Sequence, residues 1–238
     1  MLVLGASGAT GRLLVEILLQ KGVGVIAITR NENSLTNIVG AHPSLQIVET
    51  EISEMTEGDL AQYIKGCEAV LCCLGHNLTF KGMFGHPRRL VTNAIKKVTN
   101  AIGTVHANNK MKIILMNTTG NSNRDIPEKT PLSQRFVIYI LRLLLPPHLD
   151  NENAADFLRL QIGQSNNSIE WAAVRPDALI NEDQVSQYDV HTSPIRNAIF
   201  DAGSISRINV ADFMSELAIN PELWDDWKGQ MPVIYSHV

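Results

Sequence analysis

The 238-residue chain has little cysteine and no excess of basic charge, and each shortage excludes a class of protein. Its only cysteines are Cys67, Cys72 and Cys73, an odd number that cannot form a framework of paired disulfides. We therefore expect reduced thiols in a cytoplasmic protein. The formal net charge is −4 and the 20 basic residues are scattered, so we expect no nucleic-acid partner.

The chain also lacks an apolar run long enough to span a bilayer. Its most apolar stretch, FVIYILRLLLPP at residues 136–147, is too short for that and carries Arg142. The first residues show neither a basic region nor a small-residue cleavage site, so we expect no signal peptide. We expect no stable membrane insertion and a packed helix over 136–147, with docking to a membrane or a partner as the alternative.

Signatures of metal and covalent catalysis are missing as well. Because Cys72 and Cys73 are adjacent, a strand would point them to opposite faces, and no two histidines have the helical spacing of metal ligands. Neither a nucleophile elbow nor a phosphate-loop lysine occurs in the sequence. We therefore expect no bound metal.

Apolar runs of strand length alternate along the chain with longer stretches of helical periodicity. The runs predict strands at 3–4, 23–29, 45–49, 69–75, 112–118, 169–175 and 231–236. Helices are predicted at 13–21, 58–65, 88–108, 132–145, 150–165, 210–220 and 222–227. Because the strands are continuously apolar, both faces of a parallel sheet must be covered, which indicates a doubly wound α/β fold. No repeat or linker marks a second domain.

The first strand ends in a glycine turn, MLVLGASGATGR at residues 1–12. Gly5 permits a tight turn, Gly8 lets a phosphate approach, and Gly11 lets the following helix pack on the strand. The helix start offers backbone amides and a positive dipole to a pyrophosphate. A steric role at the strand end is the alternative. The predicted phosphate-binding residues are Gly5, Ser7, Gly8, Ala9, Thr10 and Gly11.

The end of the second strand distinguishes between the two nicotinamide cofactors. An acidic residue there would bind a ribose 2′-hydroxyl, whereas an arginine accommodates a 2′-phosphate. The sequence has Arg30 at this point, so it favours NADP(H) over NAD(H). A solvated loop charge is the alternative, and the nearby carboxylate of Glu32 opposes phosphate binding if it points inward.

Five segments together resemble a known family. GASGATGR, ITR, AVLCCLG, KIILMNTTG and IEWAAVRP are similar to the atypical short-chain dehydrogenase/reductases, with the NmrA-like and biliverdin-IXβ (flavin) reductase-like branch the nearest. The resemblance covers about residues 1–180 and is weaker over 206–220. It implies a Rossmann-like sheet in one domain, 1–238, in which an irregular part at about 180–238 completes the substrate side.

The resemblance also implies roles for residues at the ends of the later strands. Thr118 and Thr119 would lie near the nicotinamide, with capping of the strand end as the alternative. Asp177 stands where the family usually has glycine. The other residues expected at the cofactor are Glu51 and Ile52 beside the adenine, Leu74, Gly75 and His76 beside ribose or phosphates, and Pro176 near the carboxamide.

The usual proton donor of short-chain dehydrogenases is missing. No tyrosine is followed four residues later by lysine, so the Tyr-x-x-x-Lys dyad is absent. Ala155 occupies the position where flavin and biliverdin reductase-like members offer a histidine. The nearby acidic residues, Asp150, Glu152 and Asp156, are expected to interact favourably with the helix dipole on a solvated face, with an acid catalyst as the alternative. His76 and His86 flank a loop, containing Lys81, that could cover the cofactor. Each of the three is expected to be a polar surface residue, with contact to a substrate as the alternative.

Two functions remain open at this point. The first is an NADP(H)-dependent oxidoreductase that transfers a hydride to a small flavin-, quinone- or carbonyl-like acceptor. The alternative is an NmrA-like, non-catalytic NADP(H) sensor or assembly protein, which the missing dyad and the apolar 136–147 segment favour. The expected partner is a small molecule, and the chain is expected to be a monomer or a homodimer.

Overall fold

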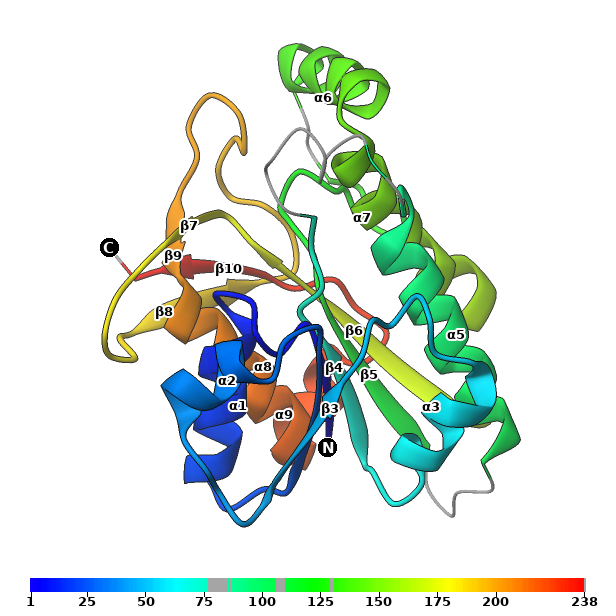
Figure 1. The fold of residues 1–238 in the computed structure, drawn as a ribbon. Helices are drawn as coiled ribbons and strands as arrows, with labels where there is room; N and C mark the ends of the chain where they lie inside the picture. Colours follow the sequence, from blue (N-terminus) through cyan, green and yellow to red (C-terminus); the bar gives the residue numbers. More distant parts are fainter. Residues whose placement is uncertain (77–84, 86, 106–109, 129–130, 238) are drawn as a thin grey trace.

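A large, mostly parallel sheet forms the centre of the molecule (Figure 1). The computed structural model describes residues 1–76, 85, 87–105, 110–128 and 131–237. Within them, eight strands pair in the order β3-β2-β1-β4-β5-β6-β10-β8, and β7 pairs with β9 separately. Their bounds are β1 Leu2–Leu4, β2 Val25–Thr29, β3 Leu45–Glu49, β4 Ala69–Cys72, β5 Met111–Met116, β6 Ile169–Pro176, β7 Ala178–Ile180, β8 Tyr188–His191, β9 Ser204–Ser206 and β10 Val233–Ser236.

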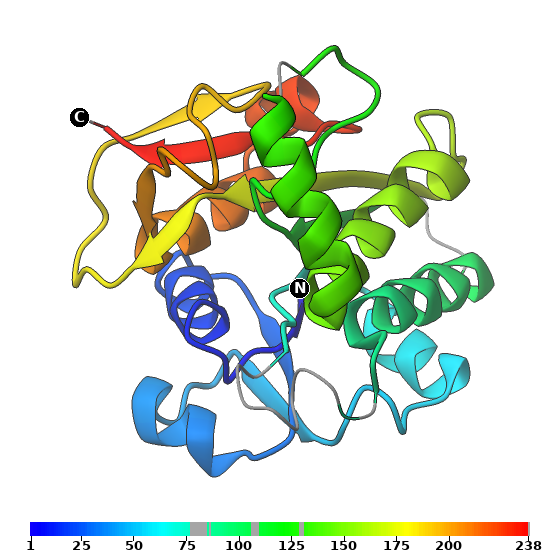
Figure 2. The ribbon, with the colours of Figure 1, turned by 90° about the horizontal axis from the view of Figure 1, so that it is seen from above.

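Helices cover both faces of this sheet, which confirms the predicted doubly wound α/β class. One face is covered by α1 (Gly11–Gln20), α2 (Asn33–Val39), α8 (Arg207–Ile219) and α9 (Pro221–Trp227). The other is covered by α3 (Glu57–Ile64), α5 (Leu90–Thr104) and α7 (Pro146–Phe157), with a π-helical turn at Leu158–Ile162. Figures 1 and 2 show α6 (Leu132–Leu144) away from the sheet, next to α7.

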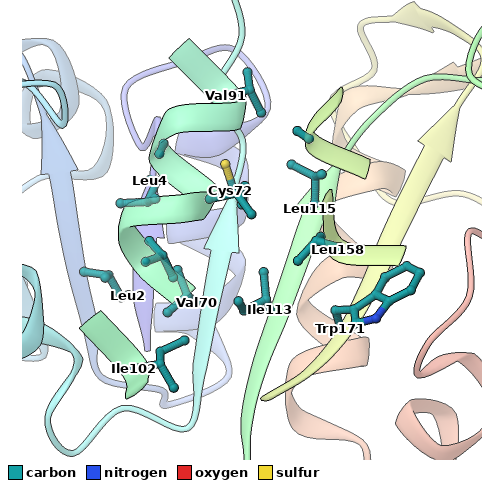
Figure 3. Packing of buried hydrophobic residues seen from close by; sticks show 14 of the residues in the cluster. Leu2, Leu4, Val70, Cys72, Val91, Ile102, Ile113, Leu115, Leu158 and Trp171 are labelled. Atoms are coloured by element: carbon teal, nitrogen blue, oxygen red, sulfur yellow. The ribbon is translucent and has the colours of Figure 1, made fainter. Parts of the chain in front are cut away.

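The alternation of side chains along the strands divides the core into two clusters. Leu2 and Leu4 of β1 pack against α5, whereas Val3 between them packs on the opposite face. Cys72 and Cys73 divide in the same way, as their adjacency predicts. Figure 3 shows the first cluster, in which side chains of β1, β4 and β5 meet those of α5. Burial on both faces explains why these strands are continuously apolar.

The observed elements differ from the predicted ones in several places. β8 runs antiparallel to β10, so the sheet is only mostly parallel. The part after residue 180 is more regular than expected, because β8 and β10 extend the main sheet and β9 pairs with β7. The helix expected over 150–165 begins at Pro146, where the proline ring suits a first helical turn. The helix expected over 88–108 spans Leu90–Thr104, and residues 106–109 lie outside the described part.

The apolar segment 136–147 is only partly packed, in contrast to the expectation. Ile138 of α6 is buried, but Phe136, Tyr139 and Leu144 are 66%, 56% and 62% exposed. This happens because α6 packs mainly on α7 and does not reach the sheet. No helix in the described residues is long and apolar enough to cross a membrane.

The glycine turn brings β1, α1 and the end of β4 into close contact. Gly5 has φ +74°, and a Cβ there would lie 2.8 Å from the carbonyl carbon of Cys73. A Cβ on Gly11 would lie within 3 Å of the Gly5 carbonyl group, which is backbone and cannot turn aside. Glycine at these positions is therefore required by the packing of helix on strand, whatever the turn binds.

We predict that Gly11→Ala destabilises the protein by about 2–3 kcal/mol, because the added methyl group forces the turn away from β1. Urea unfolding followed by circular dichroism measures this change. Gly24→Ala is the matched control, since a Cβ at Gly24 meets no atom within 4 Å. Equal stability of the two variants would contradict the packing argument.

Candidate functional site

A cleft of about 290 Å³ lies at the carboxyl ends of β1, β2, β3 and β4. The strand order reverses here, with β2 on one side of β1 and β4 on the other. Open α/β sheets bind their ligands at such a reversal. The predicted cofactor residues that line the cleft are Gly5, Ser7, Gly8, Arg30, Glu51, Ile52, Leu74 and Gly75.

The other predicted cofactor residues lie around this cleft without lining it. Ala9 is exposed on the turn, and Thr10 and Gly11 are buried beneath it at the start of α1. Pro176 is buried at the end of β6, where its carbonyl accepts a hydrogen bond from the Thr119 amide at 3.1 Å. The side chain of His76 is directed toward α7 through a hydrogen bond to Asp150.

The start of α1 can hold an anion. No side chain in the described part of the chain caps this helix, so the positive end of its dipole is open to an anion, although the amides of Arg12 and Leu14 already donate to the carbonyl oxygens of Gly8 and Thr10. Ser7 and Gly8 bring the turn to the cleft wall. The pyrophosphate of a dinucleotide fits this arrangement of backbone donors.

Arg30 is exposed at the mouth of the cleft and forms no ion pair with any described residue. A guanidinium in this position can bind a phosphate with two of its donors. Glu32, whose carboxylate would oppose a phosphate, is exposed and is not part of the cleft wall.

Lys97 supports the part of the cleft wall that contains Ile52 and Ser53, and the sequence had offered no sign of this. Its ammonium group, on α5, donates to the carbonyl oxygens of Ile52, Ser53 and Met55 at 3.2, 2.7 and 2.8 Å. The three bonds hold the loop after β3, which forms one wall of the cleft. No local pattern could have revealed them, because more than 40 residues separate the lysine from the loop.

A buried histidine–aspartate pair connects the end of β4 to α7. His76 Nε2 lies 2.8 Å from Asp150 Oδ2, with side chains 4% and 0% exposed. The expectations of a surface histidine and of a solvated Asp150 are therefore wrong. The reason is that Asp150 also accepts hydrogen bonds from the amides of Val91 and Thr92 at 2.8 and 3.0 Å, and so caps α5.

The protonation of Asp150 follows from these contacts. Burial raises its pKa, but the hydrogen bonds from His76, Thr92 and Val91 outweigh burial and leave the pKa below its usual value. The carboxylate is therefore ionised at neutral pH and only accepts hydrogen bonds, so Nε2 of His76 carries a hydrogen.

Thr118 and Thr119 end β5 with different surroundings. The Thr118 hydroxyl accepts a hydrogen bond from the Gly120 amide at 3.3 Å, which is the capping role considered as the alternative. The Thr119 hydroxyl is buried and donates to Asp177 Oδ1 at 3.3 Å. Asp177 also accepts from the amides of Ala178 and Gly203 at 2.9 and 3.0 Å. Burial raises the pKa of this carboxyl group.

Two further cavities lie beyond the end of β5, and Thr119 lines the smaller one. This cavity of about 190 Å³ is lined by Pro194 and Arg196 as well. A larger cleft of about 780 Å³ lies under α6. Ser122 and Glu128 line both, so the two are neighbouring parts of one cavity system. This system lies beyond β5, on the opposite side of the glycine turn from Arg30.

Arg175 of β6 holds the walls of this cavity system. Its guanidinium is fully buried and donates to the carbonyl oxygens of Met231, Asn121 and Thr192 at 2.7, 2.9 and 3.3 Å. It also lies 2.7 Å from a carboxylate oxygen of Glu128. One side chain thus joins β6 to the segments before β10, after β5 and after β8.

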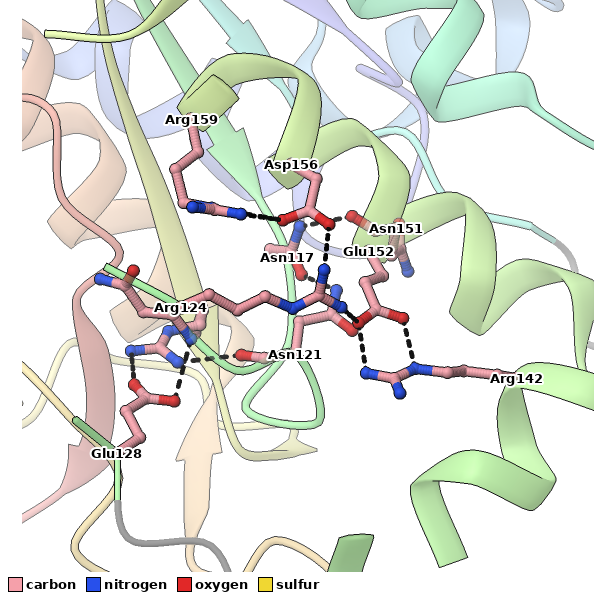
Figure 4. A network of polar contacts seen from close by, with 11 residues as sticks. Asn117, Asn121, Arg124, Glu128, Arg142, Asn151, Glu152, Asp156 and Arg159 are labelled. Atoms are coloured by element: carbon pink, nitrogen blue, oxygen red, sulfur yellow. Dashed lines mark hydrogen bonds and ion pairs between the residues drawn. The ribbon is translucent and has the colours of Figure 1, made fainter. Parts of the chain in front are cut away.

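The remaining carboxylates of α7 belong to a network of ion pairs (Figure 4). Glu152 is 8% exposed and accepts from Arg124 and Arg142, and Asp156 accepts from Arg124 and Arg159. They do not form the expected solvated face, because arginines from two other segments cover them. Ala155 is buried in the core, and His86 and Lys81 lie outside the described residues.

Comparison with known proteins agrees with this geometry. Residues 5–221 match the family described as NAD(P)H-binding. None of the curated proteins matches the chain. The chain therefore belongs to the NAD(P)H-binding family.

Solved structures share the fold at low sequence identity. A short-chain dehydrogenase/reductase from Veillonella parvula DSM 2008, in complex with NADP, has TM-score 0.70 and 16% identity over 99% of this chain and 93% of its own. An anaerobillin reductase from Escherichia coli O157:H7 has TM-score 0.66 and 15% identity over 99% and 96%. An oxidoreductase from Lactococcus lactis has TM-score 0.65 and 16% identity over 100% and 91%. These likenesses confirm a Rossmann-like fold.

We predict that Asp150→Asn lowers the free energy of unfolding at pH 7 by about 1–3 kcal/mol, because the charge-assisted hydrogen bonds to the start of α5 are lost. The folded-state pKa of Asp150 lies below its unfolded value, so its contribution is present above about pH 4. The difference between wild type and variant should shrink as pH falls further. Urea unfolding at several pH values tests this, with the exposed Asp183→Asn as control; a pH-independent difference would contradict it.

Proposed function

We propose that the protein is an NADP(H)-dependent oxidoreductase that reduces a small flavin-, quinone- or carbonyl-like acceptor. The observation that carries the proposal is the presence of two cavities along the carboxyl edge of the sheet, one at the ends of β1 to β4 and one beyond the end of β5. The cleft at the glycine turn suits a dinucleotide, and the cavity beyond Thr119 leaves room for an acceptor. Membership of the NAD(P)H-binding family supports the first half of this arrangement. We place the protein in the cytoplasm, where its three free thiols stay reduced.

The residues that would hold the cofactor follow from the cleft wall. Ser7, Gly8 and the start of α1 would bind the pyrophosphate, Ile52 would contact the adenine, and Arg30 would pair with the 2′-phosphate. The cleft fits the group, since its wall offers backbone donors and Arg30, which pairs with no carboxylate among the residues that the structure describes. When bound, the nicotinamide supplies the hydride.

The protein's own contribution would be to orient the acceptor and exclude water. The Thr119 hydroxyl is held in place by Asp177, whose carboxyl group also fixes the Gly203 amide. Thr119 is thus a fixed polar contact on the wall of the acceptor cavity. We assign proton supply to water, because the Tyr-x-x-x-Lys dyad is absent from the sequence.

The missing dyad also favours a second candidate, a non-catalytic NADP(H) sensor or assembly protein. The exposed apolar side chains of Phe136, Tyr139 and Leu144 on α6 would suit contact with a partner. In such a protein the cofactor cleft would bind NADP(H) without turnover.

We predict that Arg30→Glu weakens NADPH binding by about 10- to 100-fold, the effect of losing a charge-assisted hydrogen-bond pair. NADH lacks the 2′-phosphate, so its affinity should change by about twofold or less. Fluorescence titration of both nucleotides measures the two dissociation constants. Lys65→Glu reverses a charge on exposed Lys65 and serves as the control. Equal weakening of both nucleotides would contradict the assignment of Arg30.

We predict that the protein oxidises NADPH in the presence of at least one member of a panel of flavins, quinones and aldehydes. The decrease in absorbance of the reduced nicotinamide measures turnover, and a binding titration on the same sample measures affinity. NADPH binding without turnover on any acceptor would contradict the oxidoreductase and support the sensor.

A further inference from the structure

We propose that α6 docks the protein on a membrane surface that carries anionic lipids. This inference does not rest on the proposed oxidoreductase function, because it concerns a surface helix and not the cofactor cleft. It is carried by the apolar side chains that α6 turns to the outside, by the place of α6 in the molecule and by the charge of the segment that contains it.

The outward face of α6 consists of Phe136, Tyr139, Ile140 and Leu144, which the helical repeat places on one side. Phe136, Tyr139 and Leu144 are each more than half exposed, and Ile140 is half-buried. Ile138 lies on the opposite side of the helix and is buried. A helix on the surface of a protein normally turns polar residues to the outside, so an apolar outward face marks a site of contact.

The place of α6 leaves this face accessible. In Figure 1, α6 lies at the end of the molecule, beyond the edge of the sheet and next to α7. Ile195 adds to the apolar surface nearby, since it is 63% exposed and lines the smaller cavity together with Gln134 of α6. The apolar side chains therefore gather on one side of the molecule, where a large flat partner can meet them.

The charge of the segment around α6 is opposite to that of the whole chain. Residues 129–149 include Lys129, Arg135 and Arg142 and no acidic residue, whereas the chain has a formal net charge of −4. Arg142 pairs with Glu152 of α7, so Lys129 and Arg135 supply the positive charge that this pair leaves over. Basic residues beside an apolar helix face favour anionic lipid headgroups.

The same charge disfavours a second copy of the chain as the partner. Two copies that met through the outward face of α6 would bring two positively charged segments together, with no acidic residue in either. A bilayer instead offers an apolar layer to the side chains and anionic groups to the basic residues. Phenyl and phenol rings, such as those of Phe136 and Tyr139, suit the boundary between the two.

The length of α6 determines the kind of contact. α6 has 13 residues, fewer than the roughly 20 that a spanning helix needs. It would therefore lie in the plane of the membrane surface, with its outward face among the lipid chains and α7 behind it. Phe136 and Tyr139 also line the cleft under α6, so docking would bring this cleft to the membrane surface.

The experiment sediments the whole chain with large vesicles of phosphatidylcholine alone or mixed with an equal part of phosphatidylglycerol. We expect wild type to bind the mixed vesicles about fivefold or more tightly than the neutral ones, with the difference shrinking as salt is added. Leu144→Ser should weaken binding to the mixed vesicles about tenfold, because one exposed leucine no longer enters the lipid. Leu144 does not line the cleft under α6, so this variant leaves the cleft wall unchanged.

The matched control is Leu160→Ser, which removes a leucine that is 60% exposed in the turn after α7. Its binding should stay within about twofold of wild type, since Leu160 lies outside α6. Circular dichroism and an NADPH titration of both variants check that the fold and the cofactor cleft are unchanged.

A second measurement separates insertion of the apolar face from attraction by charge alone. Phe136→Trp places a tryptophan on the outward face, and vesicles with brominated lipid chains quench a tryptophan that enters them. We expect stronger quenching in this variant than in wild type. Equal quenching would show that α6 stays outside the lipid and would contradict docking through this face.

Three results of the sedimentation experiment would overturn the inference: no binding of wild type to the mixed vesicles, equal binding to both kinds of vesicle, or equal loss of binding in Leu144→Ser and Leu160→Ser. Light scattering without lipid tests the second copy. A wild-type dimer that Leu144→Ser dissociates would assign the outward face of α6 to self-association and would overturn the inference as well.

Discussion

The buried guanidinium of Arg175 makes the interactions on which the cavity system beyond β5 depends. It occupies the end of the longest strand and meets three carbonyl oxygens and a carboxylate from segments that lie far apart in the sequence. A buried charge with fewer partners would be costly, so each of these segments must be in place for the others to be stable. The contacts of this one guanidinium hold in place the segments that surround the cavities around Glu128.

Buried carboxylates perform a corresponding task at the ends of β4 and β6. Asp150 caps α5 and holds His76 at the end of β4, and Asp177 holds the Thr119 hydroxyl and the Gly203 amide. Both positions lie where the chain leaves the sheet, at the edge where ligands of this fold class bind. Asp150 and Asp177 each accept hydrogen bonds from two backbone amides. They lie at the carboxyl edge of a sheet whose sequence has no Tyr-x-x-x-Lys dyad.

The sequence predicted the parts of the molecule that depend on local pattern. Continuous apolar runs marked the seven parallel strands of the main sheet, β1 to β6 and β10, and the spacing of Gly5, Gly8 and Gly11 marked the turn that forms the cleft. The strands β7, β8 and β9 were missed, because they are short and only partly buried. Contacts between distant segments, such as those of Lys97, Asp150 and Arg175, leave no periodic signal, so Asp150 was expected on a solvated face. The roles assigned to the cleft residues stay predictions.

The division of the core between the two faces of the sheet has a consequence for the chemistry of the thiols. Cys72 and Cys73 lie on opposite faces, and burial raises the pKa of Cys72 to about 12 and that of Cys73 as well. Neither sulfur is a thiolate in the folded protein, so neither reacts with oxidants or alkylating reagents until its own face opens. The rate at which each thiol is modified would therefore measure local unfolding of the helical layer that covers it.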